Sequence, residues 1–180
     1  MERGPIRVLV VDDDKLLCKT ISVYLEEQGM VCYRAHDGAD GLELFRRERP
    51  DLVLLDIRMP GMPGPEMLEI LVKESPETPV VVMSATADMI DVVAVLRLGA
   101  WDYLIKPIAK MSFLEHTIQK ALERARLIRD NRRYRQHLET EVLNRTRELQ
   151  QANEALGVCR TFGAHFRAPV GILCAWLPDL

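Results

Sequence analysis

The sequence predicts an α/β fold with a five-stranded parallel sheet, doubly wound by helices on both faces, and a long C-terminal helix. Between residues 6 and 107, short apolar runs alternate with longer amphipathic stretches, which is typical of repeated βα units. Three of the five runs are apolar on both faces, as are strands that helices cover from both sides. From residue 112 to 156 there is neither Gly nor Pro, and good helix formers dominate, which indicates one long helix.

Five apolar runs are the expected strands: Ile6–Val11, Met30–Ala35, Leu52–Leu55, Val80–Ser84 and Trp101–Ile105. The second and fifth runs mix polar with apolar residues, whereas the other three are almost wholly apolar. We therefore expect the second and fifth strands at the edges of the sheet and the other three at its centre.

Four amphipathic stretches between the strands are the expected helices: Lys15–Gln28, Gly38–Arg49, Pro65–Glu74 and Ala87–Leu98. Each carries apolar residues at the spacing of one helical face. Gly29 and Gly99 follow helix ends, where glycine is common, and Pro65 suits a first helical turn. The boundaries of these helices are therefore marked in the sequence itself.

The 180 residues carry a formal net charge of −3 and are 48% hydrophobic. This allows one ordinary domain with a sizeable appendage, and the charge balance gives no overall attraction to nucleic acid or to an anionic membrane. The longest apolar runs have about half the length that a membrane-spanning helix needs, so we expect no membrane insertion. The four cysteines lack a C-x-x-C spacing and no signal-peptide pattern opens the chain, which indicates free thiols in a cytoplasmic protein.

Polar side chains gather where the expected strands end. The residues at these ends are Asp12 and Asp13 after the first strand, Asp56 after the third, Ser84 in the fourth and Lys106 after the fifth. Because ligands of an open parallel sheet bind beyond the carboxyl ends of its strands, we expect these side chains to meet at one rim. Crowded carboxylates repel one another unless a cation neutralises them, and an all-oxygen cluster suits Mg²⁺. A hydroxyl and an ammonium at the same rim suit the oxygens of a phosphoryl group.

Four motifs stand in a characteristic order and spacing. They are Val-Val-Asp-Asp-Asp at 10–14, Leu-Leu-Asp-Ile-Arg-Met-Pro-Gly-Met-Pro-Gly at 54–64, Val-Met-Ser-Ala-Thr at 82–86 and Leu-Gly-Ala-Trp-Asp-Tyr-Leu-Ile-Lys-Pro at 98–107. With these motifs, residues 6 to about 125 resemble the receiver domain of two-component response regulators, which has a flavodoxin-like fold. The resemblance implies a sensor histidine kinase or a phosphotransfer protein as partner. It also implies that the chain is no enzyme beyond the self-catalysed gain and loss of a phosphoryl group.

The resemblance implies a role for each matched position. Asp56 matches the phosphoacceptor, and Lys106 matches the lysine that pairs with the phosphoryl group. Asp13 matches the direct Mg²⁺ ligand and Asp12 its water-mediated companion. Asp56 itself and the backbone carbonyl of Arg58 would complete the protein's share of the magnesium site.

Two further positions match the switch of the family. Ser84 matches the hydroxyl that turns towards the phosphoryl group, and Tyr103 the aromatic residue that swings inward with it. The resemblance also suggests a cis peptide between Lys106 and Pro107. Arg58 and Thr86 stand where receivers tune the access of water to the acyl phosphate, and the bulk of Arg58 suggests slow phosphate loss.

Simpler interpretations stay open for several of these residues. The acidic run Asp12 to Asp14 is suited to cap the helix that follows it. Tyr103 could serve packing alone, since a partly buried aromatic side chain on an edge strand needs no switching role. Arg58 could be a solvated loop charge.

The long helix carries apolar residues at heptad spacing, interrupted by Arg135 and Arg145. They are Ala121, Ile128, Val142, Leu149 and Leu156 at one heptad position, and Leu138 and Ala152 at the other. This pattern indicates a coiled-coil seam from about Leu138 onward, and we expect a homodimer through this helix that transmits the state of the receiver. The alternative is a solvated single helix.

The rest of the chain leaves rival functions open. Seven basic residues against two acidic ones between Lys120 and Arg135 resemble the basic region of a DNA reader. A solvated charged face explains them better, so we expect no nucleic-acid partner and keep a DNA-binding regulator as the weaker alternative. We divide the chain into a receiver domain (1–125), an extended helical linker (126–156) and an apolar tail (157–180). In the tail, residues 165–169 resemble the phosphoacceptor box of histidine kinases but lack one residue between His and Arg, and the alternative is a hydrophobic tail that packs on a partner or on the receiver. The main rival function is the input half of a larger signalling enzyme, such as a phosphatase, a cyclase, a phosphodiesterase or a hybrid kinase, whose output domain is missing or degenerate.

Overall fold

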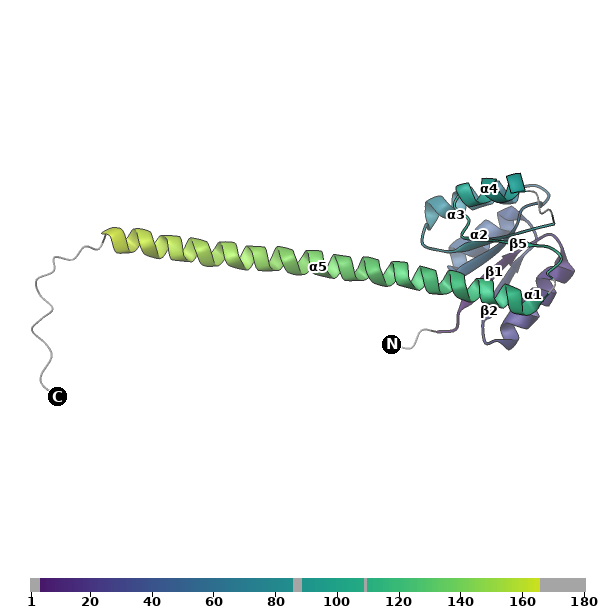
Figure 1. Cartoon of the computed structure of the whole chain (residues 1–180), viewed down its shortest axis with the longest axis horizontal. Coiled ribbons are helices and arrows are strands. Elements are labelled where there is room, and N and C mark those ends of the chain that lie inside the picture. Colours follow the sequence, from purple (N-terminus) through teal and green to yellow (C-terminus); the bar gives the residue numbers. More distant parts are fainter. Residues whose placement is uncertain (1–3, 86–88, 109, 166–180) are drawn as a thin grey trace, which may run out of the picture. The chain divides into compact units, whose positions relative to one another are not determined.

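A computed structural model describes residues 4–85, 89–108 and 110–165 of the chain (Figure 1). Residues 89–90 and 155–165 are described by their backbone only. The chain divides into two compact units, Met1–Asp130 and Asn131–Leu180. We describe the two units separately.

The first unit is built on a five-stranded parallel sheet. The strands are β1 (Arg7–Val11), β2 (Val31–Ala35), β3 (Leu52–Asp56), β4 (Val80–Ser84) and β5 (Asp102–Ile105). Their order in the sheet is β2-β1-β3-β4-β5, with every pair parallel. The predicted fold class is therefore confirmed, including the central position of β1, β3 and β4 and the edge position of β2 and β5.

Five helices follow the strands in alternation. They are α1 (Lys15–Glu27), α2 (Gly38–Glu48), α3 (Gly64–Glu74), α4 (Met89–Arg97) and α5 (Met111–His165). Each described boundary of the first four lies within two residues of the predicted one. The alternation of strand and helix is the reason that all strands run in the same direction, because each helix returns the chain across the sheet.

Two apolar layers cover the two faces of the sheet. On one face, buried side chains of α1 and α5 pack on the strands, among them Ile21, Leu25, Leu114 and Ile118. On the other face lie those of α2, α3 and α4, among them Phe45, Met67, Leu71 and Val95. Figure 1 shows α3 and α4 on the opposite side of the sheet from α1. Since β1, β3 and β4 are buried on both faces, their side chains cannot bear the functional groups except at their ends.

Two glycines allow the loop after β3 to pack closely. A Cβ atom on Gly64 would lie 2.1 Å from the carbonyl oxygen of Asp56, and one on Gly38 would lie 2.8 Å from Cβ of Met62. Neither position has room for a larger residue without movement of the backbone or of its neighbours. The loop between β3 and α3 is therefore held against the end of β3 that bears Asp56.

Helix α5 contributes to both units. Its buried face within the first unit ends at Ala125, and every side chain from Asn131 to Glu154 is exposed. The helix ends at His165, whereas the sequence analysis ended it at residue 156. A glycine inside a helix costs only about 1 kcal/mol relative to alanine, so Gly157 does not end this helix. Residues 166–180, most of the predicted apolar tail, lie outside the described residues.

Within the part of the chain that the structure describes, none of the helices combines the length and the apolar character needed to cross a membrane.

Candidate functional site

The predicted polar residues stand at the carboxyl edge of the sheet, because consecutive parallel strands all end there. Asp12 follows β1 directly, and Asp56 is the last residue of β3. Met83 is the register partner of Asp56, so the next residue, Ser84, ends the neighbouring strand β4. Ser84 in turn pairs with Ile105 in β5, and Lys106 follows. The strand register therefore brings four distant segments to one rim.

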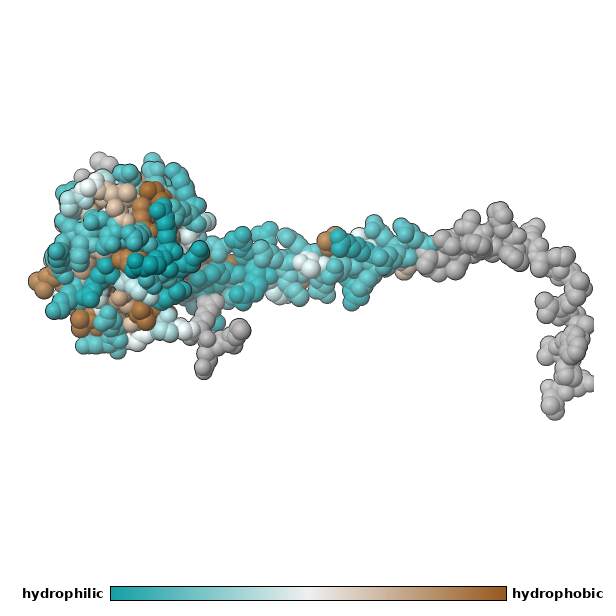
Figure 2. Space-filling view, turned by 180° about the vertical axis from the view of Figure 1, so that it is seen from behind, coloured by the Kyte–Doolittle hydropathy of each residue, from teal (hydrophilic) through white to brown (hydrophobic). Residues whose placement is uncertain are grey.

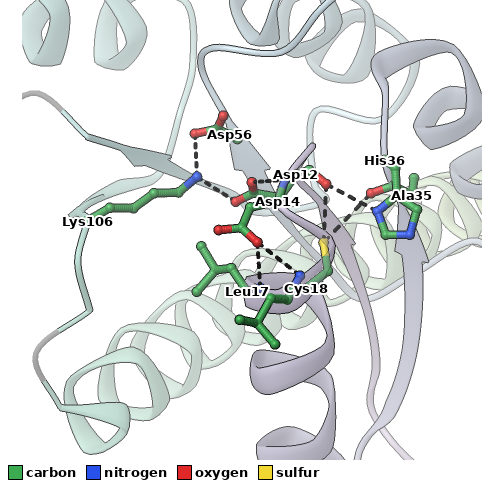
Figure 3. Close-up of polar contacts among 9 residues, drawn as sticks. Asp12, Asp14, Leu17, Cys18, Ala35, His36, Asp56 and Lys106 are labelled. Carbon is green, nitrogen blue, oxygen red and sulfur yellow. Dashed lines mark hydrogen bonds and ion pairs between the residues drawn. The ribbon is translucent and has the colours of Figure 1, made fainter.

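Lys106 joins the two innermost carboxylates (Figure 3). Its ammonium nitrogen Nζ lies 2.8 Å from Oδ1 of Asp56 and 2.6 Å from Oδ2 of Asp12. Asp12 is fully buried, Asp56 is 4% exposed, and the side chain of Lys106 is 16% exposed. The arrangement is a buried group of two negative charges and one positive charge, which leaves a net negative charge at the rim.

The surroundings of Asp56 and Lys106 shift both groups. Burial raises the pKa of Asp56, and the nearby charge of Asp12 raises it further, while Lys106 and the backbone N–H of Arg58 oppose these effects. Burial alone would lower the pKa of Lys106, but its contacts with Asp12 and Asp56 outweigh burial, so this pKa is raised. Lys106 is therefore a firmly held ammonium, whereas Asp56 carries its charge at a cost in free energy.

The donor set fits a hard divalent cation. Carboxylate oxygens of Asp12, Asp13 and Asp56 all lie within 4.8 Å of one another. Oδ2 of Asp12 is buried without a hydrogen bond of good geometry; its close contact is the ion pair with Lys106. Asp13 is exposed, so the cluster opens to solvent on one side. An oxygen-only cluster with one solvent-facing carboxylate matches the preference of Mg²⁺, which keeps several of its waters.

Asp14 has a different task from its two neighbours. Its Oδ1 accepts hydrogen bonds from the backbone N–H groups of Leu16 and Leu17, at 2.9 and 3.0 Å. It is therefore the N-cap of α1. Its own backbone N–H donates to Oδ1 of Asp12 at 3.1 Å, which fixes the direction of that carboxylate. The capping interpretation thus holds for Asp14, while Asp12 and Asp13 belong to the acidic cluster.

Ser84 and Tyr103 lie on neighbouring strands and differ in burial. Ser84 is 1% exposed at the end of β4. Tyr103 is half-buried, pairs with Val82 in the sheet, and packs against the apolar layer formed by α2, α3 and α4. These positions are compatible with a switch pair and also with simple packing of Tyr103. The peptide bond between Lys106 and Pro107 is cis, as the resemblance suggested.

Arg58 links the site to α4. Its backbone N–H donates to the carboxylate of Asp56, while its guanidinium Nη2 lies 3.7 Å from Oδ2 of Asp91 in the first turn of α4. Arg58 stands in a recognisable motif, whereas Asp91 does not, and no local pattern in the sequence signals a contact between these two segments. Thr86, the other predicted tuning position, lies outside the described residues.

Sequence reasoning also missed two groups behind Asp12. The thiol of Cys18 donates to the carbonyl oxygen of Asp12 at 3.4 Å, and Nδ1 of His36 lies 3.3 Å from the same oxygen (Figure 3). Burial, followed by the charge of Asp12, raises the pKa of Cys18 to about 12, so this thiol stays protonated. Both groups hold the backbone of Asp12 in place. Neither Cys18 nor His36 belongs to a motif that predicts this contact.

Comparison with known proteins gives the same family at the level of sequence. A profile of the response regulator receiver domain matches residues 8–119. The chain is 37% identical over 134 residues to the regulatory protein AtoC of Escherichia coli K12, which covers 74% of this chain and 29% of that protein. It is 43% identical over 100 residues to the transcriptional regulatory protein CseB of Streptomyces coelicolor, covering 56% of this chain and 42% of that protein. The chain thus spans well under half the length of these curated relatives.

Solved structures agree with this assignment. A CheY-like response regulator receiver domain protein from Methanospirillum hungatei matches with a TM-score of 0.64 and 30% identity, covering 68% of this chain and 97% of that one. NtrX from Brucella abortus matches with a TM-score of 0.67 and 31% identity, covering 70% of this chain and 29% of that one.

Proposed function

The chain belongs to the family of response regulator receiver domains, and from that membership we propose that Asp56 accepts a phosphoryl group from a histidine kinase or a phosphotransfer protein. One observation carries the proposal: Lys106 holds its ammonium between Asp56 and Asp12 at the rim, beside a third carboxylate. Asp13 is exposed, so a phosphodonor can approach the cluster from solvent. Asp12 is fully buried, so water screens its charge only weakly.

The transfer forms one bond and breaks one. An oxygen of the Asp56 carboxylate attacks phosphorus while the bond between phosphorus and a donor histidine nitrogen breaks. The electron pair of that bond leaves with the imidazole, which takes up a proton, and an acyl phosphate remains on Asp56. Lys106, 2.8 Å from Oδ1 of Asp56, is placed to neutralise charge on the phosphoryl oxygens. The group is lost by hydrolysis: a water oxygen bonds to phosphorus while the bond between phosphorus and the Asp56 oxygen breaks, which releases inorganic phosphate and restores the carboxylate.

The acidic cluster would hold Mg²⁺ through Asp12, Asp13, Asp56 and the backbone carbonyl of Arg58. When bound, the ion supplies positive charge to the phosphoryl oxygens. This assignment rests on the oxygen-only donor set and on the buried Oδ2 of Asp12, which Lys106 satisfies only in part. The protein's own contribution is to hold these oxygens in place through the N-cap at Asp14 and the hydrogen bonds around Asp12.

Phosphorylation of Asp56 tests the proposal directly. We expect a small phosphodonor such as acetyl phosphate, with Mg²⁺, to add one phosphoryl group, detected by intact mass. Asp56→Asn should abolish labelling, and Asp13→Asn should weaken it and raise the Mg²⁺ concentration required. Asp14→Asn is the matched control, because asparagine caps a helix as well as aspartate does, so labelling should persist. Labelling that survives in Asp56→Asn would contradict the proposal.

The output would run through Ser84, Tyr103 and α5. In this proposal the Ser84 hydroxyl turns to the phosphoryl group, Tyr103 follows, and the change reaches a homodimer formed through α5. The exposed apolar residues Leu138, Val142 and Leu149 on α5 support the pairing. Light scattering with and without beryllofluoride, a mimic of the acyl phosphate, measures whether the mass changes. An unchanged monomer mass in both states would contradict transmission through a dimer.

A second candidate function is the input half of a larger signalling enzyme. It is favoured by the lengths of the relatives, since the matched region is 29% of AtoC and 42% of CseB. In that case Asp56 chemistry would be unchanged, but the readout would be the activity of an attached output domain. Fusion of residues 1–165 to a reporter enzyme whose activity needs dimerisation would test whether the chain can control an output in this way.

A further inference from the structure

The second unit presents a stripe of exposed apolar side chains on one side of α5. Tyr134 is 65% exposed, Leu138 42%, Val142 64% and Leu149 65%. The stripe ends near Ala152, which is exposed too. In Figure 2 the visible surface of this segment is mostly hydrophilic, with isolated apolar side chains. The stripe is therefore narrow, which is typical of a coiled-coil seam rather than of a helix that packs on a sheet.

The spacing along the stripe departs from a continuous heptad. A heptad seam alternates steps of three and four residues, and the steps from Val142 through Arg145 and Leu149 to Ala152 obey this rule. Continued towards the N-terminus without a break, the rule would place Leu138 and then Arg135 in the seam, and Tyr134 beside it. The apolar residues instead show two steps of four in succession, from Tyr134 to Leu138 and from Leu138 to Val142.

Helix geometry favours the apolar alternative. At about 100° per residue, Tyr134 and Val142 lie about 40° to either side of Leu138. Tyr134 and Ala152 are 18 residues apart, about five whole turns, and so share one line along the helix. Arg135 lies about 60° from Leu138 on the other side, at the margin of the stripe. A seam that includes Tyr134 and leaves out Arg135 thus needs a local insertion of four residues in the heptad, known as a stutter.

We propose that residues 131–152 of α5 pair in parallel with the same segment of a second copy, in a register with a stutter at Leu138 that places Tyr134 in the seam and Arg135 outside it. The proposal deepens, and rests on, the homodimer of the proposed function. At a stutter the two helices locally unwind, so the supercoil is straighter around Leu138 than further along.

A second copy in parallel fits this face better than an antiparallel copy does. In parallel, each seam residue meets its own counterpart, so Tyr134, Leu138, Val142, Leu149 and Ala152 all form layers within the segment. In antiparallel, the stutters coincide only if Leu138 faces Leu138. Leu149 would then face Leu127 of the second copy, which is exposed too, and Ala152 would face Arg124. We favour parallel pairing because all five seam residues then meet an apolar counterpart, whereas the antiparallel arrangement sets one of them against a charged residue.

Charges beside the seam allow the parallel arrangement. At the flanking positions, Glu141 faces Thr146 of the second copy, and Glu148 faces Asn153, so no like charges meet there. Arg145 is the one basic residue within the seam, and its guanidinium lies 3.3 Å from Glu148 of the same helix. This contact lowers the cost of bringing two Arg145 side chains together. Because the segment is only roughly 33 Å long, its interface is small and we expect a weak dimer.

Single cysteines can distinguish the registers in the full-length chain. The background is Cys159→Ser with Cys174→Ser, in which Cys18 and Cys32 remain; burial raises their pKa values to about 12 and about 11, which slows their oxidation. Into this background we would place Tyr134→Cys or Arg135→Cys, and as a second matched pair Val142→Cys or Leu143→Cys. After mild oxidation, dimers are counted on a non-reducing gel, with the background chain as the blank.

We expect Tyr134→Cys and Val142→Cys to cross-link at least fivefold more than Arg135→Cys and Leu143→Cys. Stronger cross-linking at Arg135→Cys than at Tyr134→Cys would overturn the stutter and leave a continuous heptad dimer. Cross-linking only in a mixture of Tyr134→Cys and Val142→Cys chains would overturn the parallel orientation. Equal, blank-level yields at all four positions would overturn pairing itself. None of these outcomes depends on phosphorylation of Asp56, which the labelling experiment tests by itself.

Discussion

The rim of the first unit and the second half of α5 differ in how far their charged side chains are buried. At the rim, Asp12, Asp56 and Lys106 come from three strand ends and are almost completely buried. On α5, the pair Arg145 and Glu148 comes from one helical turn, and its side chains are 73% and 65% exposed. Removal of the partner of a buried charge changes the free energy of unfolding by several kcal/mol. An exposed ion pair contributes about 1 kcal/mol or less. We therefore place the proposed phosphoryl chemistry at the rim and the proposed pairing of α5 on its apolar stripe.

The largest difference should come from truncation of leucines in the two regions. Leu54 in β3 is fully buried, and Leu143 on α5 is 50% exposed. Leu54→Ala leaves a cavity beside the strand that carries Asp56, and should lower the free energy of unfolding by about 3–5 kcal/mol. Leu143→Ala should change it by less than about 0.5 kcal/mol. Urea unfolding measures the free energy of both variants. Similar losses of stability in the two would contradict the exposed position of Leu143 on α5.

The next effect compares two of the lysines that form ion pairs, Lys106 at the rim and the exposed Lys120. Lys106→Met leaves the buried carboxylates of Asp12 and Asp56 without their cation, which should cost about 2–4 kcal/mol of unfolding free energy. Lys120→Met removes a partner of Asp102 at 3.3 Å, where the lysine side chain is 70% exposed, and should cost at most about 1 kcal/mol.

Mg²⁺ gives a further test of the difference between these two lysine variants. Added Mg²⁺ should restore part of the stability of Lys106→Met, because it supplies positive charge to the same carboxylates, and should leave Lys120→Met unchanged. Thermal unfolding with and without Mg²⁺ gives both values. Equal responses of the two variants would show that the acidic cluster does not bind the ion.

The rim could be predicted from sequence because each of its residues follows a recognisable strand. The apolar runs fix the strands, parallel strands end on one edge, and Asp12, Asp56, Ser84 and Lys106 therefore had to meet there. The contact of Arg58 with Asp91 could not be predicted, since Arg58 stands in a loop without a periodic pattern and no pattern in the sequence places α4 beside that loop. The same holds for Cys18 and His36 behind Asp12, which are single residues among many.

The end of α5 shows a different limit of sequence reasoning. The sequence pattern predicts that the helix ends before Gly157, but the helix runs on to His165. A glycine shifts the local free energy by only about 1 kcal/mol, so it marks a boundary only when neighbouring residues also favour one. At Gly29 the backbone has a φ of +80°, which few other residues adopt, and there the glycine does follow the end of a helix.

A smaller effect follows from the raised pKa of Asp56. The folded state disfavours the charged form, so this carboxylate destabilises the fold at pH values above its ordinary pKa of 3.8, and the penalty is absent below that value. Asp56→Asn leaves Lys106 paired with Asp12 alone. We expect a gain of about 1 kcal/mol at pH 7 without Mg²⁺, which disappears as the pH falls towards 3.8.

Thermal unfolding from pH 3.5 to pH 8 checks the sign of this effect. Asp40→Asn, at an exposed position in the first turn of α2, is the control, and its stability relative to the parent chain should show no such gain. A gain for Asp56→Asn that grows towards low pH would contradict the assignment of Asp56 as the strained charge of the rim.

The smallest effect lies where the buried rim meets an exposed pair, at Arg58 and Asp91. We expect Arg58→Ala to shorten the lifetime of the acyl phosphate, because its side chain no longer hinders water next to Asp56. Asp91→Asn should shorten the lifetime only about twofold, since the side chains are 63% and 43% exposed and such a pair holds Arg58 weakly.

The double variant should then match Arg58→Ala alone, because Asp91 would act only through Arg58. Glu43→Gln, which removes an exposed partner of Arg47 on α2, should leave the lifetime unchanged. Additive losses in the double variant would mean that Asp91 affects phosphate loss by a route of its own, for example through the position of α4.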